Sequence, residues 1–175
     1  ALAALAALQA PAAASPSRAS NARVRLAISS YSYWHFKPTK VPIETVIDQA
    51  AALGVQGVDI LHRQMESEDP AYLQRLKRHA FTRGIDLICL SIHQDFVDPN
   101  PVERQKAVAH TIRCIELAYQ MGIPCIRINS GRWNTIASFD DLMKARGVEP
   151  VLPGYTEDDG FRWCIECIEQ CLVKA

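Results

Sequence analysis

The sequence predicts an α/β fold in which helices alternate with parallel strands. The main observation is a junction that occurs three times, as "LGVQGVDI" from Leu53, "RGIDLICL" from Arg83 and "MGIPCIRI" from Met121. Each copy follows a helix-like stretch and has a glycine suited to the left-handed residue after a helix, followed by a short β-rich run. With the strand "RLAISS" from Arg25, a strand–helix pair occurs four times in succession. Such alternation is typical of a parallel sheet with right-handed crossovers.

The four helices also have recognisable starts. Pro42 precedes the first, Asp69-Pro70 the second and Asn100-Pro101 the third, and proline is favoured in the first turn of a helix. The fourth begins after Thr156, with Asp159 three residues later in an N-cap pattern, and runs towards the chain end.

The spacing and patterning of the strands indicate a barrel. Their centres fall near Ile28, Ile60, Leu90 and Ile128, close to the ~31 residues per unit of a (β/α)8 barrel. One face of each strand is aliphatic and the other is small or polar, whereas a doubly wound sheet would be aliphatic on both faces. We therefore predict a (β/α)8 TIM barrel with only about four βα units present in this chain. A four-stranded doubly wound sheet is the alternative.

Asp59 and Arg127 occupy the same place in the repeat, on the second and fourth strands. Alternate strands of a barrel contribute to one interior layer, so we expect these two side chains to pair inside it. A structural ion pair is the favoured interpretation over a catalytic role.

Half a barrel would leave strand edges uncovered. We therefore expect residues 24–175 to be the amino-terminal half of a longer protein, or else to pair with a second half as a homo-oligomer. The catalytic half would then be missing, and the chain alone would be inactive.

Residues 1–22 are excluded from the predicted fold. The run "ALAALAALQAPAAASPS" is similar to the apolar region and cleavage zone of an export signal, which predicts an exported or periplasmic protein. An Ala-rich leader without a targeting role is the alternative, and the protein would then be cytoplasmic. No later segment has the length of a membrane span.

Composition narrows the class of partner. With 49% hydrophobic and 22% charged residues, the chain is an ordinary globular domain. Its 19 basic and 19 acidic residues balance, so no excess charge favours nucleic acid or anionic lipid. The sequence therefore predicts neither a nucleic-acid nor a membrane partner.

Three cysteines follow a C-x-x-C-x-x-x-C pattern, namely Cys164, Cys167 and Cys171. Metal-binding sets of this kind usually lie on loops, but here the pattern falls on one face of a predicted helix. The same face carries Phe161, Ile165, Ile168 and Leu172. We therefore predict that the cysteines are core residues.

Candidate site residues lie where strands end. His93 ends the third strand in "LICLSIHQDF", and Asn129 and Arg132 follow the fourth in "INSGRW". A barrel keeps its chemistry at these carboxyl ends, so His93 is a candidate catalytic residue and the other two are candidate substrate ligands. The loop "SYSYWHFKPTK" adds Trp34 and His35, because aromatic faces beside polar tips suit sugar rings. Alternatively, this loop only covers the barrel end.

Three other histidines lack metal-ligand spacing in the sequence. His62, His79 and His110 show no such spacing with each other or with carboxylates, and we expect His79 and His110 on helix surfaces.

The segments "ALGVQGVDIL", "GIDLICLSIHQDF" and "LAYQMGIPCIRINSGRW" resemble the second, third and fourth strand regions of the xylose isomerase-like TIM barrels. This superfamily contains sugar and sugar-phosphate isomerases and epimerases, and also the endonuclease IV group. The resemblance covers about residues 24–175 and matches the amino-terminal half only.

The resemblance implies aldose-ketose isomerisation or carbon epimerisation, with a divalent metal such as Mn or Mg assisting proton transfer beside a carbonyl. In such enzymes the metal ligands come from the fifth to eighth strands, so we expect them outside this chain. The substrate would be a sugar or sugar phosphate. The alternatives are a non-catalytic sugar-binding or structural half-barrel and, less favoured, a nuclease; the nuclease branch needs a histidine where this chain has Asn129-Ser130-Gly131.

Overall fold

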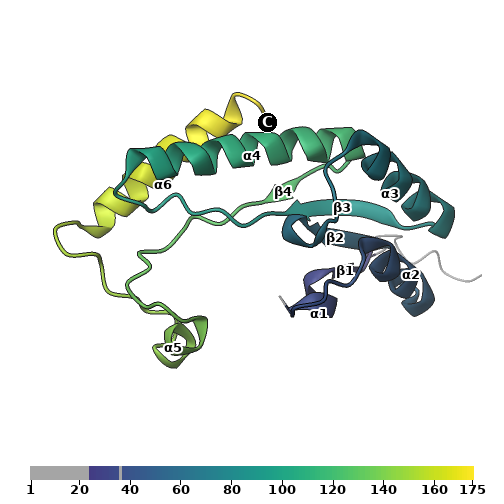
Figure 1. Ribbon diagram of the computed structural model, residues 1–175, viewed down its shortest axis with the longest axis horizontal. Coiled ribbons are helices and arrows are strands. Elements are labelled where there is room, and N and C mark those ends of the chain that lie inside the picture. The colour runs from purple at the N-terminus through teal and green to yellow at the C-terminus, as the bar shows by residue number, and fades with distance from the viewer. Residues whose placement is uncertain (1–23, 36) are drawn as a thin grey trace, which may run out of the picture.

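The computed structural model describes residues 24–35 and 37–175, so the predicted leader lies outside the described residues. Its four strands form one parallel sheet (Figure 1). They are β1 (Ala27–Ser29), β2 (Gly57–Leu61), β3 (Asp86–Ser91) and β4 (Ile126–Arg127). The order in the sheet is β1-β2-β3-β4, so each crossover leads to the adjacent strand. A doubly wound sheet reverses its order at a switch point, and the predicted half barrel is therefore confirmed over that alternative.

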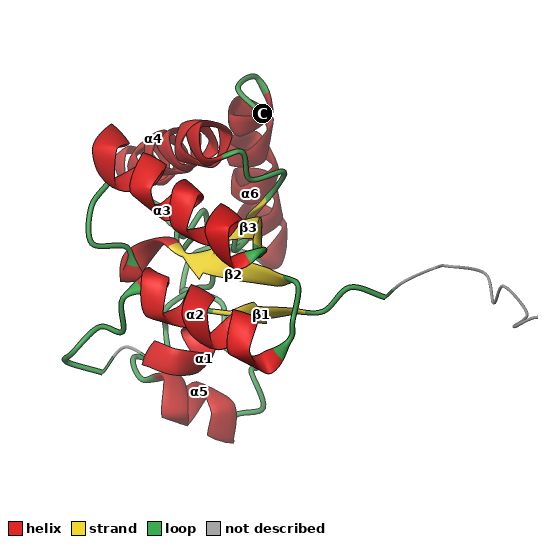
Figure 2. Ribbon diagram, turned by 90° about the vertical axis from the view of Figure 1, so that its right-hand side faces the viewer, coloured by secondary structure: helices red, strands yellow, loops and turns green. Residues whose placement is uncertain are grey.

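A long helix follows each strand. These helices are α2 (Ile43–Leu53), α3 (Pro70–Arg83), α4 (Pro101–Met121) and α6 (Glu157–Leu172). Three short helices lie in the connections, namely α1 (Tyr31–Trp34), the 3-10 helix η1 (His62–Gln64) and α5 (Phe139–Lys144). Helices α2, α3 and α4 lie side by side along the sheet (Figure 2).

The predicted helix ends are present. Gly54, Gly84 and Gly122 have φ angles of 73°, 67° and 69°, and their amides donate to carbonyls of the preceding turn. At the start of α6, the Thr156 hydroxyl accepts from the Asp159 amide and the Asp159 carboxylate accepts from the Thr156 amide. Each strand therefore begins at a defined distance from the helix before it.

The main core lies between the sheet and helices α2 to α4. It includes Val58, Ile60 and Leu90 of the strands, and Ile92 just after β3, all on the predicted helix-facing side. The opposite side of the sheet carries Asp59, Ser91 and Arg127, which are hydrogen-bonded to one another across β2, β3 and β4.

A second core cluster joins α4 to α6. Phe96 and Val108 pack there with Cys164, Cys167 and Cys171, and these cysteines are free thiols. The prediction that they are core residues is confirmed.

The prediction that Phe161, Ile165 and Leu172 belong to the same buried face is wrong. These side chains are 66%, 56% and 63% exposed. The reason is that α6 packs against α4 through its three cysteines, and the three exposed side chains lie to either side of this contact.

Among the described residues, no helix is both long enough and apolar enough to cross a membrane.

Candidate functional site

A polar groove of about 860 Å³ lies at the carboxyl ends of β3 and β4. It is lined by three of the residues predicted for the site, His93, Asn129 and Arg132, together with Arg63 from η1. These residues come from the segments that follow three strands. The fold therefore brings together side chains that are far apart in the sequence.

Asp95 fixes one wall of this groove. Its Oδ1 accepts from the backbone amides of Val97 at 2.9 Å and Arg132 at 3.3 Å, and its Oδ2 accepts from Asn134 Nδ2 at 2.8 Å. One carboxylate thus joins the segment after β3 to the segment after β4. The position of Arg132 on the rim depends on this contact.

Gly131 permits the close approach of these two segments. Its φ is 114°, and a Cβ at this position would lie 2.1 Å from Asp95 Oδ1 and 2.8 Å from the Val97 nitrogen. No larger residue fits here without moving the backbone. The "SGR" turn is therefore part of the construction of the groove.

A chain of hydrogen bonds crosses the sheet beneath the groove. Ser91 Oγ donates to Asp59 Oδ1 at 2.7 Å, and Arg127 Nε donates to Ser91 Oγ at 3.0 Å. Arg127 Nη1 then donates to Asn129 Oδ1 at 2.9 Å, which orients that amide at the rim.

The predicted ion pair between Asp59 and Arg127 is therefore wrong, since Ser91 on β3 lies between them. Neighbouring strands are about 4.8 Å apart, so residues on β2 and β4 are separated by about 10 Å. The Ser91 hydroxyl on β3 lies in this gap and hydrogen-bonds to both Asp59 and Arg127.

His93 has an environment that favours its neutral form. Burial lowers the pKa of His93, and the nearby Arg127 and Arg63 guanidinium groups lower it further. A neutral imidazole can accept a proton or hydrogen-bond a hydroxyl. This state suits the catalytic role predicted for His93.

A second cavity of about 600 Å³ shares Arg63 and His93 with the groove and extends to Trp34, Lys40, His62 and His110. The indole Nε1 of Trp34 donates to the Lys37 carbonyl at 2.8 Å, and Lys40 Nζ lies 5.6 Å from the ring centroid. The predicted Trp34 is thus brought close to His93.

His35 is arranged differently. It is exposed, has a φ of 49°, and packs its ring edge against Tyr31 with the centroids 5.2 Å apart. The structure does not bring His35 together with the other predicted residues.

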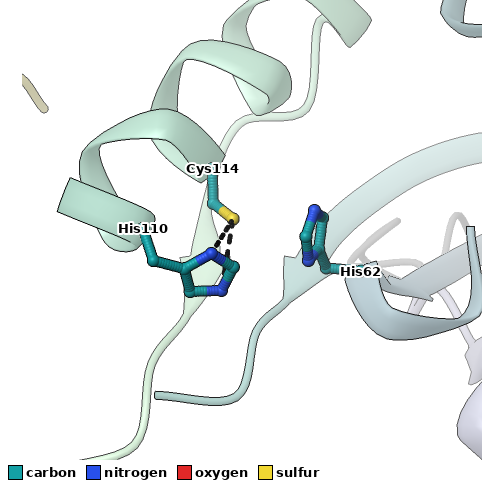
Figure 3. Close-up of side chains that lie close together, drawn as sticks. All are labelled: His62, His110 and Cys114. Atoms are coloured by element: carbon teal, nitrogen blue, oxygen red, sulfur yellow. Dashed lines mark hydrogen bonds between the residues drawn. The ribbon is translucent and has the colours of Figure 1, made fainter. Parts of the chain in front are cut away.

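Sequence reasoning missed a cluster beside the second cavity. His62 on η1 faces His110 and Cys114 on α4, and one potential ligand atom from each residue lies within 4.8 Å of the others (Figure 3). His62 Nε2 is also 2.7 Å from Glu68 Oε1. The statement that these histidines lack ligand spacing is therefore wrong for His62 and His110.

The residues around the groove do not fit the Mn²⁺ or Mg²⁺ that the family resemblance implies. These hard cations prefer several carboxylate, carbonyl or water oxygens. The carboxylate of Asp95 already accepts three hydrogen bonds, and the arginines at positions 63, 127 and 132 bring positive charge to the same region. The prediction that such ligands lie outside this chain stays a prediction.

Comparison with known proteins agrees with the fold. A family model described as "Xylose isomerase-like TIM barrel" matches residues 47–174. None of the curated proteins matches the chain significantly in sequence.

Two solved structures of D-psicose 3-epimerase superpose on the chain. One, from Clostridium cellulolyticum H10 with D-tagatose, has a TM-score of 0.63 and 15% identity over 86% of this chain and 48% of its own. The other, in the presence of D-fructose, has a TM-score of 0.62 and 16% identity over 83% of this chain and 46% of its own. The chain thus spans about half the length of the structures it matches, and the likeness is one of fold.

Proposed function

The chain belongs to the xylose isomerase-like TIM barrel family, and we propose that it forms the amino-terminal half of a sugar or sugar-phosphate isomerase or epimerase. The family match and the epimerase folds of the structural neighbours support this class of activity. The observation that carries the proposal is the polar groove at the carboxyl ends of β3 and β4. Active sites of TIM barrels lie at this end of the sheet.

The side chains of the groove suit a hydroxylated ligand. Asn129, held through its Oδ1 by Arg127, leaves its amide NH2 to donate to a hydroxyl or carbonyl oxygen. Arg132 adds a guanidinium that can bind hydroxyl or phosphate oxygens, although Glu149 lies 3.4 Å from its Nη1. His93, in its neutral form, can take a proton from a carbon-bound hydroxyl or hydrogen-bond it.

A second candidate function is a non-catalytic sugar-binding half-barrel. The same groove favours this function. Asp95 is the carboxylate among the described groove residues, and it already accepts hydrogen bonds, so it is not available as a catalytic base. Both functions predict sugar binding, but only the first predicts turnover that depends on His93.

The test compares His93→Gln with His79→Gln in the protein that contains this chain. His79 is the matched control because it lies on α3, bonded to Asp48, and is not one of the residues lining the groove. Binding of D-fructose, D-tagatose and phosphorylated ketohexoses is measured by calorimetry, and interconversion by chromatography with Mn²⁺ or Mg²⁺ added. We expect His93→Gln to lower kcat/KM by about 100-fold or more, with His79→Gln unchanged.

Sugar binding without turnover, unaffected by either substitution, would favour the binding module. No binding of any of these sugars would remove the proposed function.

A further inference from the structure

The cluster of His62, His110 and Cys114 has the donor set of a transition-metal site. Two imidazoles and one thiol are ligands that Zn²⁺ accepts, and three protein ligands are the number found in sites that keep a fourth position open. Cys114 Sγ already lies 3.8 Å from His110 Nε2. In a tetrahedral zinc site the ligand atoms are about 3.3 to 3.7 Å apart, and here all three lie within 4.8 Å of one another, so binding one ion draws them closer together.

The secondary structure presents these ligands from two directions. His110 and Cys114 are separated by one turn on the same face of α4, where residues four apart are neighbours. His62 approaches from η1, immediately after β2, with the ring centroids of His62 and His110 5.1 Å apart (Figure 3).

Glu68 gives His62 the hydrogen bond that metal-binding histidines usually have. Its Oε1 accepts from His62 Nε2 at 2.7 Å, which leaves the lone pair on Nδ1. That Nδ1 is buried and has no hydrogen-bond partner among the residues that the structure describes. A carboxylate behind one ring nitrogen and a lone pair on the other is the arrangement found in carboxylate–histidine–zinc triads.

Arg113 holds Glu68 in this position. Its Nε contacts Glu68 Oε2 while Oε1 faces His62. The Glu68 carboxylate thus lies between the Arg113 guanidinium and the His62 ring, with one oxygen on each.

We propose that His62, His110 and Cys114 bind one Zn²⁺ ion, with Glu68 as a positioning residue for His62. The ion joins the β2–α3 connection to α4, since His62 and Glu68 lie in the former and the other two residues in the latter. His62 and His110 also line the second cavity beside His93. The site is therefore next to the proposed sugar groove, but its existence does not depend on the sugar chemistry.

The test is titration of the purified, metal-free chain with Zn²⁺ by calorimetry and with Co²⁺ by absorption spectroscopy. We expect one Zn²⁺ per chain, and with Co²⁺ both a thiolate-to-metal charge-transfer band and the visible bands of a tetrahedral site. Cys114→Ser should abolish the charge-transfer band. His110→Gln should weaken Zn²⁺ binding while keeping that band at high Co²⁺ concentration, which separates loss of a ligand from loss of the fold.

Glu68→Gln tests the positioning role. It should retain the Co²⁺ spectrum but weaken affinity by about 10- to 100-fold, the usual effect of losing a hydrogen-bond partner of a ligand. Circular dichroism of each variant reports whether the helices are intact.

The matched controls are Cys125→Ser and His79→Gln. Cys125 is an exposed thiol on the approach to β4, and His79 is another histidine with a carboxylate partner. Both should bind Zn²⁺ like the unsubstituted chain. Absence of a thiolate band in the unsubstituted chain, or a band that survives Cys114→Ser and is lost in Cys125→Ser, would overturn the proposal.

Discussion

Replacing Gly131 with alanine should damage the groove more than the unusual φ angle alone explains. The added Cβ would lie 2.1 Å from Asp95 Oδ1, 2.8 Å from the Val97 nitrogen and 2.9 Å from the Phe96 nitrogen. Two of these atoms are backbone, so the turn itself must shift. The shift breaks the hydrogen bonds through which Asp95 holds the amides of Val97 and Arg132.

Gly147 supplies the matched control for this substitution. Its φ is +77°, and a Cβ there meets nothing within 4 Å. Gly147→Ala therefore costs only the backbone strain of a left-handed alanine, about 1 kcal/mol. Gly131→Ala adds the loss of the partly buried hydrogen bonds of Asp95 at about 1–3 kcal/mol, for a total of about 2 to 4 kcal/mol.

The assay is thermal unfolding followed by circular dichroism, together with calorimetric sugar binding. At about 3 °C per kcal/mol for a chain of this size, Gly131→Ala should lower the Tm by roughly 6–12 °C and Gly147→Ala by roughly 3 °C. Only the former should weaken sugar binding, because Arg132 moves with the turn. Equal Tm values for the two variants would refute the close approach on which this reasoning depends.

Three further substitutions test other parts of the fold. Ser91→Ala removes the hydroxyl between Asp59 and Arg127 and should lower the free energy of unfolding in urea by about 1–3 kcal/mol; an unchanged urea midpoint would show that the bridge contributes nothing. In the folded protein His93 has a pKa below its ordinary value. Below about pH 6.5 the unfolded chain therefore binds more protons than the folded one, and the free energy of unfolding decreases as the pH falls. His93→Gln should therefore lose less stability than the unsubstituted chain between about pH 7 and pH 5, a difference that urea titrations at both pH values will reveal or exclude. Thr156→Ala removes the N-cap of α6 and should cost about 1 kcal/mol, measured by the same titration at neutral pH.

The elements of the fold were predictable because their signals are local. Gly54, Gly84 and Gly122 mark the ends of helices, and each end fixes the start of the following strand within a few residues. The side-chain alternation along β2 and β3 then identifies which face is the interior. The short helix α5 was not predicted, although Ser138 and Asp141 form an N-cap at its start.

The groove was only partly predictable. Position at a strand end was enough to identify His93, Asn129 and Arg132, because parallel strands place their carboxyl ends at one edge. It did not identify Asp95 as the residue that joins two loops, since that contact depends on how closely the loops approach at Gly131. The same limit applies to His62 and His110, which only the packing of η1 against α4 brings together.

Two histidines that follow neighbouring strands have side chains of opposite charge beside them. His93, after β3, lies near Arg63 and Arg127, whose positive charges disfavour both its own protonation and a metal ion beside it. His62, after β2, has the Glu68 carboxylate at 2.7 Å, which favours a cation. Because both rings line one cavity, a ligand that enters it meets a neutral imidazole on one side and the proposed zinc site on the other. Substitution of Glu68 should therefore alter metal affinity and leave the pH dependence that His93 contributes unchanged. His93→Gln should remove that pH dependence and leave metal affinity unchanged. If either substitution changes both measurements, the two histidines act as one site.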